Sequence, residues 1–133
     1  MRERYFTLDE ATALLPRLTT LLTGLRERRQ SLLGHEREQE TRYQQRVRVN
    51  GHAQGGEEFV QRREAIEADQ TALRELVEEI QALGVEVKDV DMGLVDFPAW
   101  REGRVVYLCW RLGEPTIAWW HDLDTGFGGR QPL

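Results

Sequence analysis

The chain has 133 residues, of which 40% are hydrophobic and 31% charged, and its formal net charge is -5. This length favours one domain with a single core, and the apolar fraction excludes a disordered chain. No stretch reaches the ~20 apolar residues of a membrane span, and no apolar signal segment follows the charged N-terminus. The single cysteine, Cys109, excludes an internal disulfide. These features predict a soluble cytoplasmic protein formed by one domain, residues 1–133.

A long first helix is predicted over residues 7–49. Thr7 and Glu10 have the spacing of a capping box, in which each side chain accepts a hydrogen bond from the other residue's backbone amide. Pro16 removes one backbone donor near the start of this helix, so we expect a kink or a break near Leu15. An apolar stripe then recurs at helical spacing. Its members are Leu14, Leu15, Leu18, Leu21, Leu22, Leu25, Leu32 and Leu33.

The second helix, predicted over residues 57–83, has the clearest periodicity in the chain. Four apolar residues recur every seven positions, as in a coiled coil. They are Phe59, Ile66, Leu73 and Ile80. Gly84 is placed to end this helix, because glycine readily adopts the left-handed conformation of a C-cap. The glycine-rich segment 50–56 is predicted to be a loop, which makes the two helices an antiparallel hairpin.

Opposite charges on the two helices favour this hairpin. Residues 1–50 hold ten Arg against seven acidic residues, whereas residues 51–83 hold three Arg against eight. Folding the chain at the centre of the loop aligns these charges, although each exposed pair contributes only ~0–1 kcal/mol. The predicted pairs are Arg48 with Glu58, Arg42 with Glu64, Arg37 with Asp69 and Arg28 with Glu78, and the predicted apolar contacts are Val47 with Phe59 and Leu33 with Leu73.

From Val85 onward the hydrophobic period changes to two, which is typical of strands. Strands are predicted at 85–88, 93–97, 104–111 and 116–121, with a turn at 112–115 and a tail at 122–133. Both faces of the strand at 104–111 are apolar, so it should be central in the sheet and covered on both sides. The first helix can cover one face. The other face needs a loop, the C-terminal tail or a second subunit.

These elements predict an α+β fold: a long antiparallel helical hairpin, with its first helix kinked near Pro16, followed by a small antiparallel β-sheet. A helix of about 40 residues is ~60 Å long, roughly twice the diameter of a domain of this size. Two helices alone bury so long a stripe poorly. We therefore predict a homodimer in which two hairpins form a coiled-coil-like arrangement of four helices.

Several sequence blocks resemble a known family. They are Tyr5 to Ala11, Leu14 to Pro16, Gly84 to Asp89, Gly93 to Pro98, Leu108 to Glu114, and the segment from Trp120 to Arg130. Across nearly the whole chain, these blocks look like the prokaryotic family catalogued as domain of unknown function number 2203. The resemblance implies no activity, because the family carries no assigned one. The site predictions therefore come from residue chemistry.

Oxygen and imidazole donors in the C-terminal part could hold a divalent metal ion if the strands brought them together. The candidate ligands are His121, Asp124, Asp89, Asp91 and Asp96. This donor set favours Mg²⁺, Mn²⁺ or Fe²⁺ over zinc, which prefers more His and Cys ligands. The alternative is that these acids cap turns and pair with the arginines at the strand ends, Arg111 and Arg130.

The C-terminal part could instead form a pocket that binds a small molecule. Trp119 and Trp120 point to opposite sides of a strand, so at least one of them should border the surface or an interface. The candidate ligand-binding residues are Arg111, Trp120, His121 and Arg130. The same aromatic wall could instead form the rim of the dimer contact.

Three further features do not define a site. Cys109 lies in an apolar strand, where a thiolate would be costly, so we interpret it as a core residue. The segment His35 to Gln39 resembles the HExxH zinc motif but lacks its second His. Arg42, Arg46 and Arg48 near the hairpin tip could contact phosphate, but the net charge of -5 argues against a nucleic-acid partner.

The function favoured by these features is a homodimeric interaction or scaffold module, and they favour a non-enzyme over an enzyme without deciding between the two. The alternative is a protein that binds a small ligand or a divalent metal ion, including a metal-dependent enzyme, with its site in the acidic and aromatic C-terminal half. Neither pattern defines catalytic residues, a cofactor or a substrate.

Overall fold

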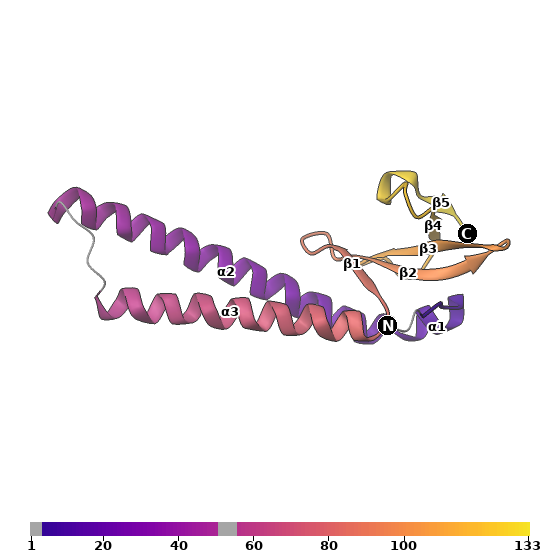
Figure 1. Ribbon diagram of the computed structural model, residues 1–133, viewed down its shortest axis with the longest axis horizontal. Helices are drawn as coiled ribbons and strands as arrows, with labels where there is room; N and C mark the ends of the chain where they lie inside the picture. Colours follow the sequence, from indigo (N-terminus) through magenta and orange to yellow (C-terminus); the bar gives the residue numbers. More distant parts are fainter. Residues whose placement is uncertain (1–3, 51–55) are drawn as a thin grey trace. The chain divides into compact units, whose positions relative to one another are not determined.

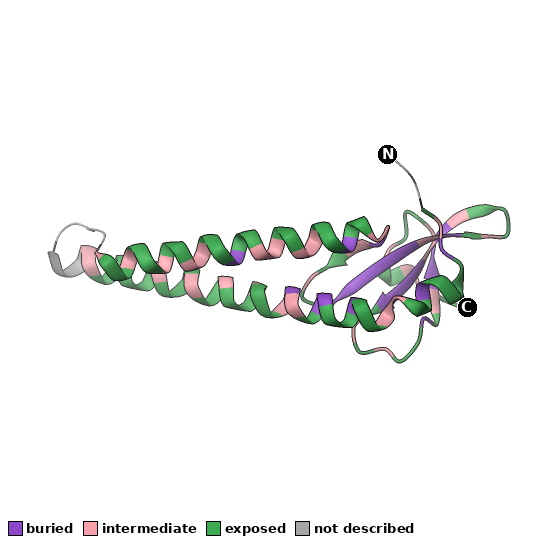
Figure 2. Ribbon diagram, turned by 90° about the horizontal axis from the view of Figure 1, so that it is seen from below, coloured by how far each residue is buried: buried purple, intermediate pink, exposed green. Residues whose placement is uncertain are grey.

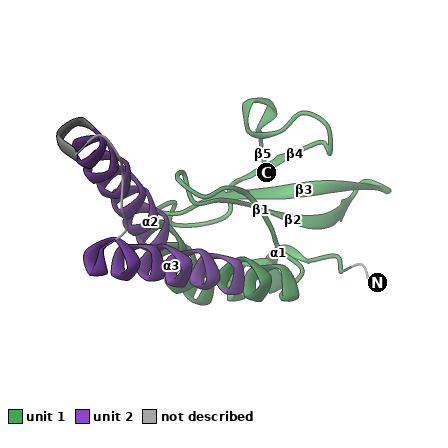
Figure 3. Ribbon diagram, turned by 60° about the vertical axis from the view of Figure 1, so that its left-hand side comes forward, with its two compact units in different colours: residues 1–26, 76–133 green, residues 27–75 purple. Residues whose placement is uncertain are grey.

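The computed structural model describes residues 4–50 and 56–133, except for the side chains of residues 48–50. Its elements, in chain order, are α1 (Leu8–Ala13), α2 (Leu15–Asn50), α3 (Glu57–Ala82), β1 (Glu86–Asp89), β2 (Leu94–Arg101), β3 (Arg104–Arg111), β4 (Trp119–His121), the 3-10 helix η1 (Phe127–Gly129) and β5 (Gln131–Pro132) (Figure 1). The predicted α+β fold, with long paired helices followed by an antiparallel sheet, is confirmed. The chain divides into unit 1, residues 1–26 and 76–133, and unit 2, residues 27–75 (Figure 3).

The start of the helical region follows the predicted local signals. The Glu10 amide donates to the Thr7 hydroxyl over 3.1 Å, and the Thr7 amide donates to the Glu10 carboxylate over 2.9 Å. This capping box begins α1, which ends at Ala13. A new helix then begins at Leu15, so the expected break near Pro16 is present. The proline therefore separates a short first helix from the long second one.

The end of α3 is also set locally. Gly84 has a φ of +89°, in the left-handed region that glycine adopts without strain. Its amide donates to the Gln81 carbonyl over 2.9 Å, which satisfies one of the carbonyls left open at the helix end. The glycine therefore stops the helix and directs the chain into β1, as predicted.

The sheet has five antiparallel strands in the order β1-β2-β3-β4-β5. β3 is the central strand, as its apolar character predicts. The segment predicted as a tail differs from expectation, because it contributes η1 and a fifth strand that pairs with Trp119 and Trp120. A two-residue strand that includes Pro132 has too little hydrophobic alternation to be recognised from sequence.

β2 is longer than its sequence pattern indicates. It continues through Pro98 to Arg101, whereas the proline suggested an end at Phe97. The Pro98 carbonyl accepts a hydrogen bond from the Phe6 amide over 2.7 Å, so the hydrogen-bonding edge of this residue faces away from β3. The missing N–H of the proline therefore removes no bond from the β2–β3 ladder.

One face of the sheet, here called the helix face, forms the core of unit 1 together with the helix segments that belong to this unit. Phe97 is fully buried and meets Phe6 edge to face at 5.4 Å. The buried residues of this face are Val95, Phe97, Ala99, Val106, Leu108, Trp110 and Trp120. The helices contribute the buried residues Ala11, Leu18, Leu21, Leu22, Leu25 and Ile80. As expected, the beginning of the helical region covers one side of β3.

The opposite face of the sheet, here called the tail face, is covered by the C-terminal segment (Figure 1). The Arg130 guanidinium donates to both oxygens of Glu114, over 2.9 and 2.7 Å, and to the Cys109 sulfur over 3.3 Å. The sequence left a loop, the C-terminal tail or a second subunit as the possible cover of this face, and the tail is the one observed. It encloses polar side chains rather than a second apolar core.

Unit 2 is the part of the helical hairpin that has almost no buried residues. Between residues 27 and 75, Asp69 is the only residue buried in the part that the structure describes (Figure 2). Arg28 donates to Asp69 over 3.0 Å, and Ser31 donates to the same carboxylate over 2.8 Å. This hairpin is therefore joined by polar contacts and half-exposed apolar side chains.

The hairpin register differs from the predicted one. Arg42 pairs with Glu58, at 3.6 Å, and not with Glu64 as predicted. Asp69 pairs with Arg28 and not with Arg37. The predicted pair Arg48 with Glu58 lies outside the described side chains. The prediction placed the fold-back at the centre of the glycine-rich segment, but helix lengths rather than loop composition determine which residues lie opposite one another. The observed pairs place the fold-back closer to the end of α2.

Candidate metal centre

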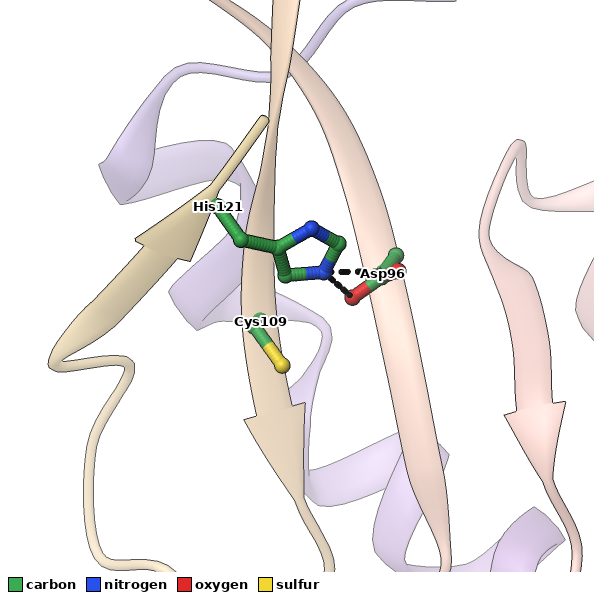
Figure 4. A group of neighbouring side chains, drawn as sticks. All are labelled: Asp96, Cys109 and His121. Atoms are coloured by element: carbon green, nitrogen blue, oxygen red, sulfur yellow. Dashed lines mark hydrogen bonds and ion pairs between the residues drawn. The ribbon is translucent and has the colours of Figure 1, made fainter. Parts of the chain in front are cut away.

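Three potential metal ligands converge on the tail face of the sheet (Figure 4). Asp96 comes from β2, Cys109 from β3 and His121 from β4. The register places Asp96 opposite Cys109 and His121 opposite Tyr107, so side chains of three adjacent strands point to one side. All three ligands are at most 2% exposed, and their donor atoms lie within 4.8 Å of one another.

The orientation of the His121 ring is fixed at both nitrogens. Nδ1 lies 2.7 Å from the carbonyl oxygen of Asp122, which can only accept, so this nitrogen carries a proton. Nε2 lies 3.0 Å from each carboxylate oxygen of Asp96. Metal-binding histidines commonly have this arrangement, with one nitrogen held by a carbonyl and the other directed at the ion.

Asp96 and His121 share a proton. Two groups that could only accept would repel at 3.0 Å, so a proton lies between Nε2 and the carboxylate. Burial raises the pKa of Asp96, whereas the hydrogen bond and the charge of His121 act in the opposite direction. A metal ion that entered the site would displace this shared proton.

Cys109 is a buried thiol at neutral pH. Burial raises its pKa to about 11, although the hydrogen bond from Arg130 acts in the opposite direction. Cys109 is fully buried, as its position in an apolar strand predicted, and its raised pKa favours the thiol over the thiolate. A thiol can still become a ligand, because a bound metal ion lowers its pKa and replaces its proton.

Arg130 and Glu114 form the outer wall of this centre. The bidentate ion pair holds the guanidinium against Cys109, and the hydrogen bonds from Arg130 lower the pKa of Glu114. The Arg130 guanidinium also lies 4.5 Å from the centre of the Phe127 ring. The C-terminal segment is thereby fixed over the three ligands, and a positive charge is placed beside the sulfur.

The geometry fits a small transition-metal ion. The ligands of one tetrahedral zinc ion, each roughly 2.0–2.3 Å from it, lie about 3–4 Å apart. His121 Nε2 lies 3.0 Å from the Asp96 oxygens, and all three donor atoms lie within 4.8 Å of one another. Nitrogen, sulfur and one carboxylate oxygen suit Zn²⁺ or Fe²⁺ better than Mg²⁺, which prefers an all-oxygen shell. Three protein ligands also leave a coordination position for water or for another molecule.

The structure brings together only part of the metal set predicted from sequence. His121 and Asp96 meet, whereas Asp89, Asp91 and Asp124 are exposed and lie outside this cluster of buried ligands. Asp89 accepts a hydrogen bond from the Met92 amide over 2.9 Å, which caps the turn before β2. The turn-capping alternative therefore describes Asp89 correctly.

The predicted ligand-binding residues are also divided. His121 and Arg130 lie on the tail face, but Trp120 is buried on the helix face, because neighbouring residues of a strand point to opposite sides. Arg111 is exposed at the end of β3, where its amide donates to Glu114 over 2.7 Å. Trp120 and His121 therefore cannot contact the same ligand from one side of the sheet.

Cys109 was not predicted as a ligand. It alternates with apolar residues in β3, and sequence alone does not show that Asp96 lies directly opposite it. The alternation of side chains along the strand could have identified it. Cys109 lies on the same face of the strand as Tyr107, whereas Val106, Leu108 and Trp110 lie on the other face and form the apolar core. Assigning the polar members of each strand to one face would have grouped all three ligands.

Comparison with known proteins identifies the family of this chain. The chain belongs to the family described as uncharacterized conserved protein (DUF2203), whose profile matches residues 4–133. No curated protein and no solved structure matches the chain significantly. Among the helices that the structure describes, none has both the length and the apolar character needed to cross a membrane.

Proposed function

We propose that this protein binds one divalent transition-metal ion, Zn²⁺ or Fe²⁺, through Asp96, Cys109 and His121. The observation that carries the proposal is the convergence of three different ligand types, all buried, from three adjacent strands. A reducing cytoplasm suits the site, because it keeps the single thiol available.

The protons held by the three ligands predict how metal binding depends on pH. Metal binding replaces the thiol proton of Cys109 and the proton shared by Asp96 and His121. Affinity should therefore rise with pH, and protons should be released into the buffer. Arg130 assists the loss of the thiol proton, because its guanidinium donates to the sulfur.

The test is a zinc titration of protein purified without a histidine tag and stripped of metal, with a chromophoric chelator as competitor. One ion should bind per chain. Cys109→Ser and His121→Gln should each weaken binding by about 100-fold or more, which exceeds the usual effect of losing an outer-shell partner. His35→Gln is the matched control, because this histidine lies in unit 2 beside Asp69.

Circular dichroism of each variant shows whether it is folded. If a variant unfolds, the wild-type titration still decides the question. Wild-type protein that holds no stoichiometric ion, or folded Cys109→Ser and His121→Gln variants that bind as tightly as wild type, would overturn the proposal. The Asp96–His121 pair would then serve to join β2 to β4.

A second function, self-association as a homodimeric interaction module, is favoured by unit 2. Its repeat residues Phe59, Ile66 and Leu73 are only half-buried, and no apolar residue in the described part of this unit is buried. Leu33 and Tyr43 are more than 40% exposed. A second hairpin of the same sequence would present the same apolar stripe and could cover this one, as in four-helix arrangements.

Light scattering coupled to size-exclusion chromatography tests self-association. We expect a dimer at micromolar concentration and a monomer for Leu33→Glu, which places a charge in the stripe. Leu8→Glu is the control, because Leu8 has a similar exposure, 45% against 41%, but lies in α1. A monomeric wild-type protein, or equal effects of the two substitutions, would contradict this function.

A further inference from the structure

The geometry points to a second binding site in unit 1, a hollow that takes a small aromatic carboxylate. The hollow has a volume of about 680 Å³, which is within the usual range for small-molecule sites. It lies between the segment that precedes α1, the end of α3 and strands β1 to β3. Its lining includes Arg4, Tyr5, Glu86, Pro98, Val105 and Tyr107. None of these is a proposed metal ligand, so the inference does not depend on the metal ion.

Aromatic and apolar side chains make the hollow suitable for a planar ring. The Tyr5 ring lies 5.4 Å from the ring of Trp100, which is 60% exposed. Trp100 lies opposite Val105 in the β2–β3 ladder, so it extends the wall of the hollow. An exposed tryptophan beside a tyrosine offers a large stacking surface at little cost in conformational entropy.

The charge at the rim of the hollow selects an anion. The Arg4 guanidinium donates to the Leu83 carbonyl over 3.1 Å, which uses one of its five N–H groups. The acid in the lining, Glu86, already pairs with Lys88 at 2.9 Å. The negative charge of Glu86 is therefore compensated. One face of the Arg4 guanidinium lies over the Phe6 ring, 4.3 Å from its centre, which leaves the remaining in-plane N–H donors to bind a carboxylate in the planar geometry that guanidinium favours.

Gly84 leaves room for the Arg4 side chain to pack against the turn after α3. A Cβ at this position would lie 3.0 Å from Cδ and 3.1 Å from Cβ of Arg4. The absence of a side chain therefore lets the stem of the arginine lie along the turn, while its guanidinium lies 4.3 Å from the centre of the Phe6 ring. The residue that ends α3 thus also positions the group that would recognise the anion.

Three compounds with one carbon skeleton test this inference: 3-phenylpropionate, 3-phenylpropanol and 3-phenylpropylamine. Each is titrated into the full-length protein, and binding is followed by two-dimensional amide NMR. We expect 3-phenylpropionate to shift the signals of Val85, Val105 and the Trp100 indole in a saturable way. It should bind about tenfold more tightly than the alcohol, and the amine should bind most weakly.

Arg4→Gln should remove the preference for the acid while leaving the alcohol unaffected, and Tyr5→Ala should weaken both. Arg111→Gln is the control, because this arginine is exposed at the end of β3 and does not line the hollow. Arg4 is exposed, so the substitution should leave the fold intact. The inference is overturned if no compound gives saturable shifts at the hollow, if acid and amine bind equally, or if Arg4→Gln retains the preference.

Discussion

Unit 1 and unit 2 use similar apolar residues in opposite ways. Unit 1 buries its leucines, valines and aromatic residues between a sheet and short stretches of helix, whereas the described part of unit 2 buries only an aspartate. A sheet offers a broad face that several helical turns can cover, but two helices alone bury only a narrow seam. Stability and candidate sites therefore belong to unit 1, whereas the described part of unit 2 leaves its apolar side chains half-buried or exposed.

The largest expected effect is on the core of unit 1. Phe97→Ala should lower the free energy of unfolding by about 3–5 kcal/mol, because it leaves a cavity against Phe6. Leu73→Ala, at a half-buried position of unit 2, should lower it by about 1 kcal/mol. Urea unfolding followed by tryptophan fluorescence measures the first effect, since all four Trp residues lie in unit 1. Equal losses for the two variants would remove the contrast between the units.

A smaller loss is expected at the metal centre in the absence of metal. Asp96→Asn should lower the free energy of unfolding of the metal-free protein by about 3 kcal/mol, because it breaks the buried pair with His121. Glu114→Gln, which alters a partly exposed pair with Arg130, should cost less. Urea unfolding in the presence of a chelator measures both. A loss at Asp96 no greater than that at Glu114 would show that burial adds nothing to this pair.

The polar contact within unit 2 should have a still smaller effect. Asp69→Asn should destabilise the hairpin by about 1–2 kcal/mol, because Arg28 and Ser31 lose a charged acceptor. Burial alone would raise the pKa of Asp69, but hydrogen bonds from Ser31 and Arg28 and the charge of His35 lower it overall. The contribution of Asp69 is therefore complete above the unfolded pKa, near 4, and is lost as the pH falls through the lower folded value.

Amide hydrogen exchange across a pH series measures this dependence in unit 2. Protection of α3 amides in the wild-type protein should fall below pH 4 more steeply than in Asp69→Asn. An identical pH profile for the two proteins would show that the carboxylate does not support the hairpin.

The smallest effect is expected at the first turn of α1. Thr7→Ala should cost about 1 kcal/mol, because the Glu10 amide loses its acceptor. Thr12→Ala is the control, since it lies in the same helix away from the cap. Differential scanning calorimetry should show a lower Tm for Thr7→Ala alone. Equal shifts for the two variants would mean that the capping box does not anchor the start of unit 1.

Local signals predicted the elements well, whereas pairing across the chain was harder to predict. Thr7 with Glu10, Pro16 and Gly84 act through neighbours within a few residues, so their effects could be read directly from the sequence. The hairpin register and the position of Asp96 opposite Cys109 depend on how far each element extends, which composition does not fix. For this reason His121 and Asp96 were predicted as ligands but Cys109 was not.

The central claim, that Asp96, Cys109 and His121 form one metal site, is tested most directly by cobalt substitution. Cys109 is the only cysteine in the chain, so a sulfur-to-cobalt charge-transfer band can arise only from this residue. We predict that Co²⁺ added to metal-free protein gives this band at one equivalent, together with the intense visible bands of tetrahedral coordination, and that Cys109→Ser abolishes the charge-transfer band. A wild-type spectrum that remains that of hydrated Co²⁺ would contradict the account.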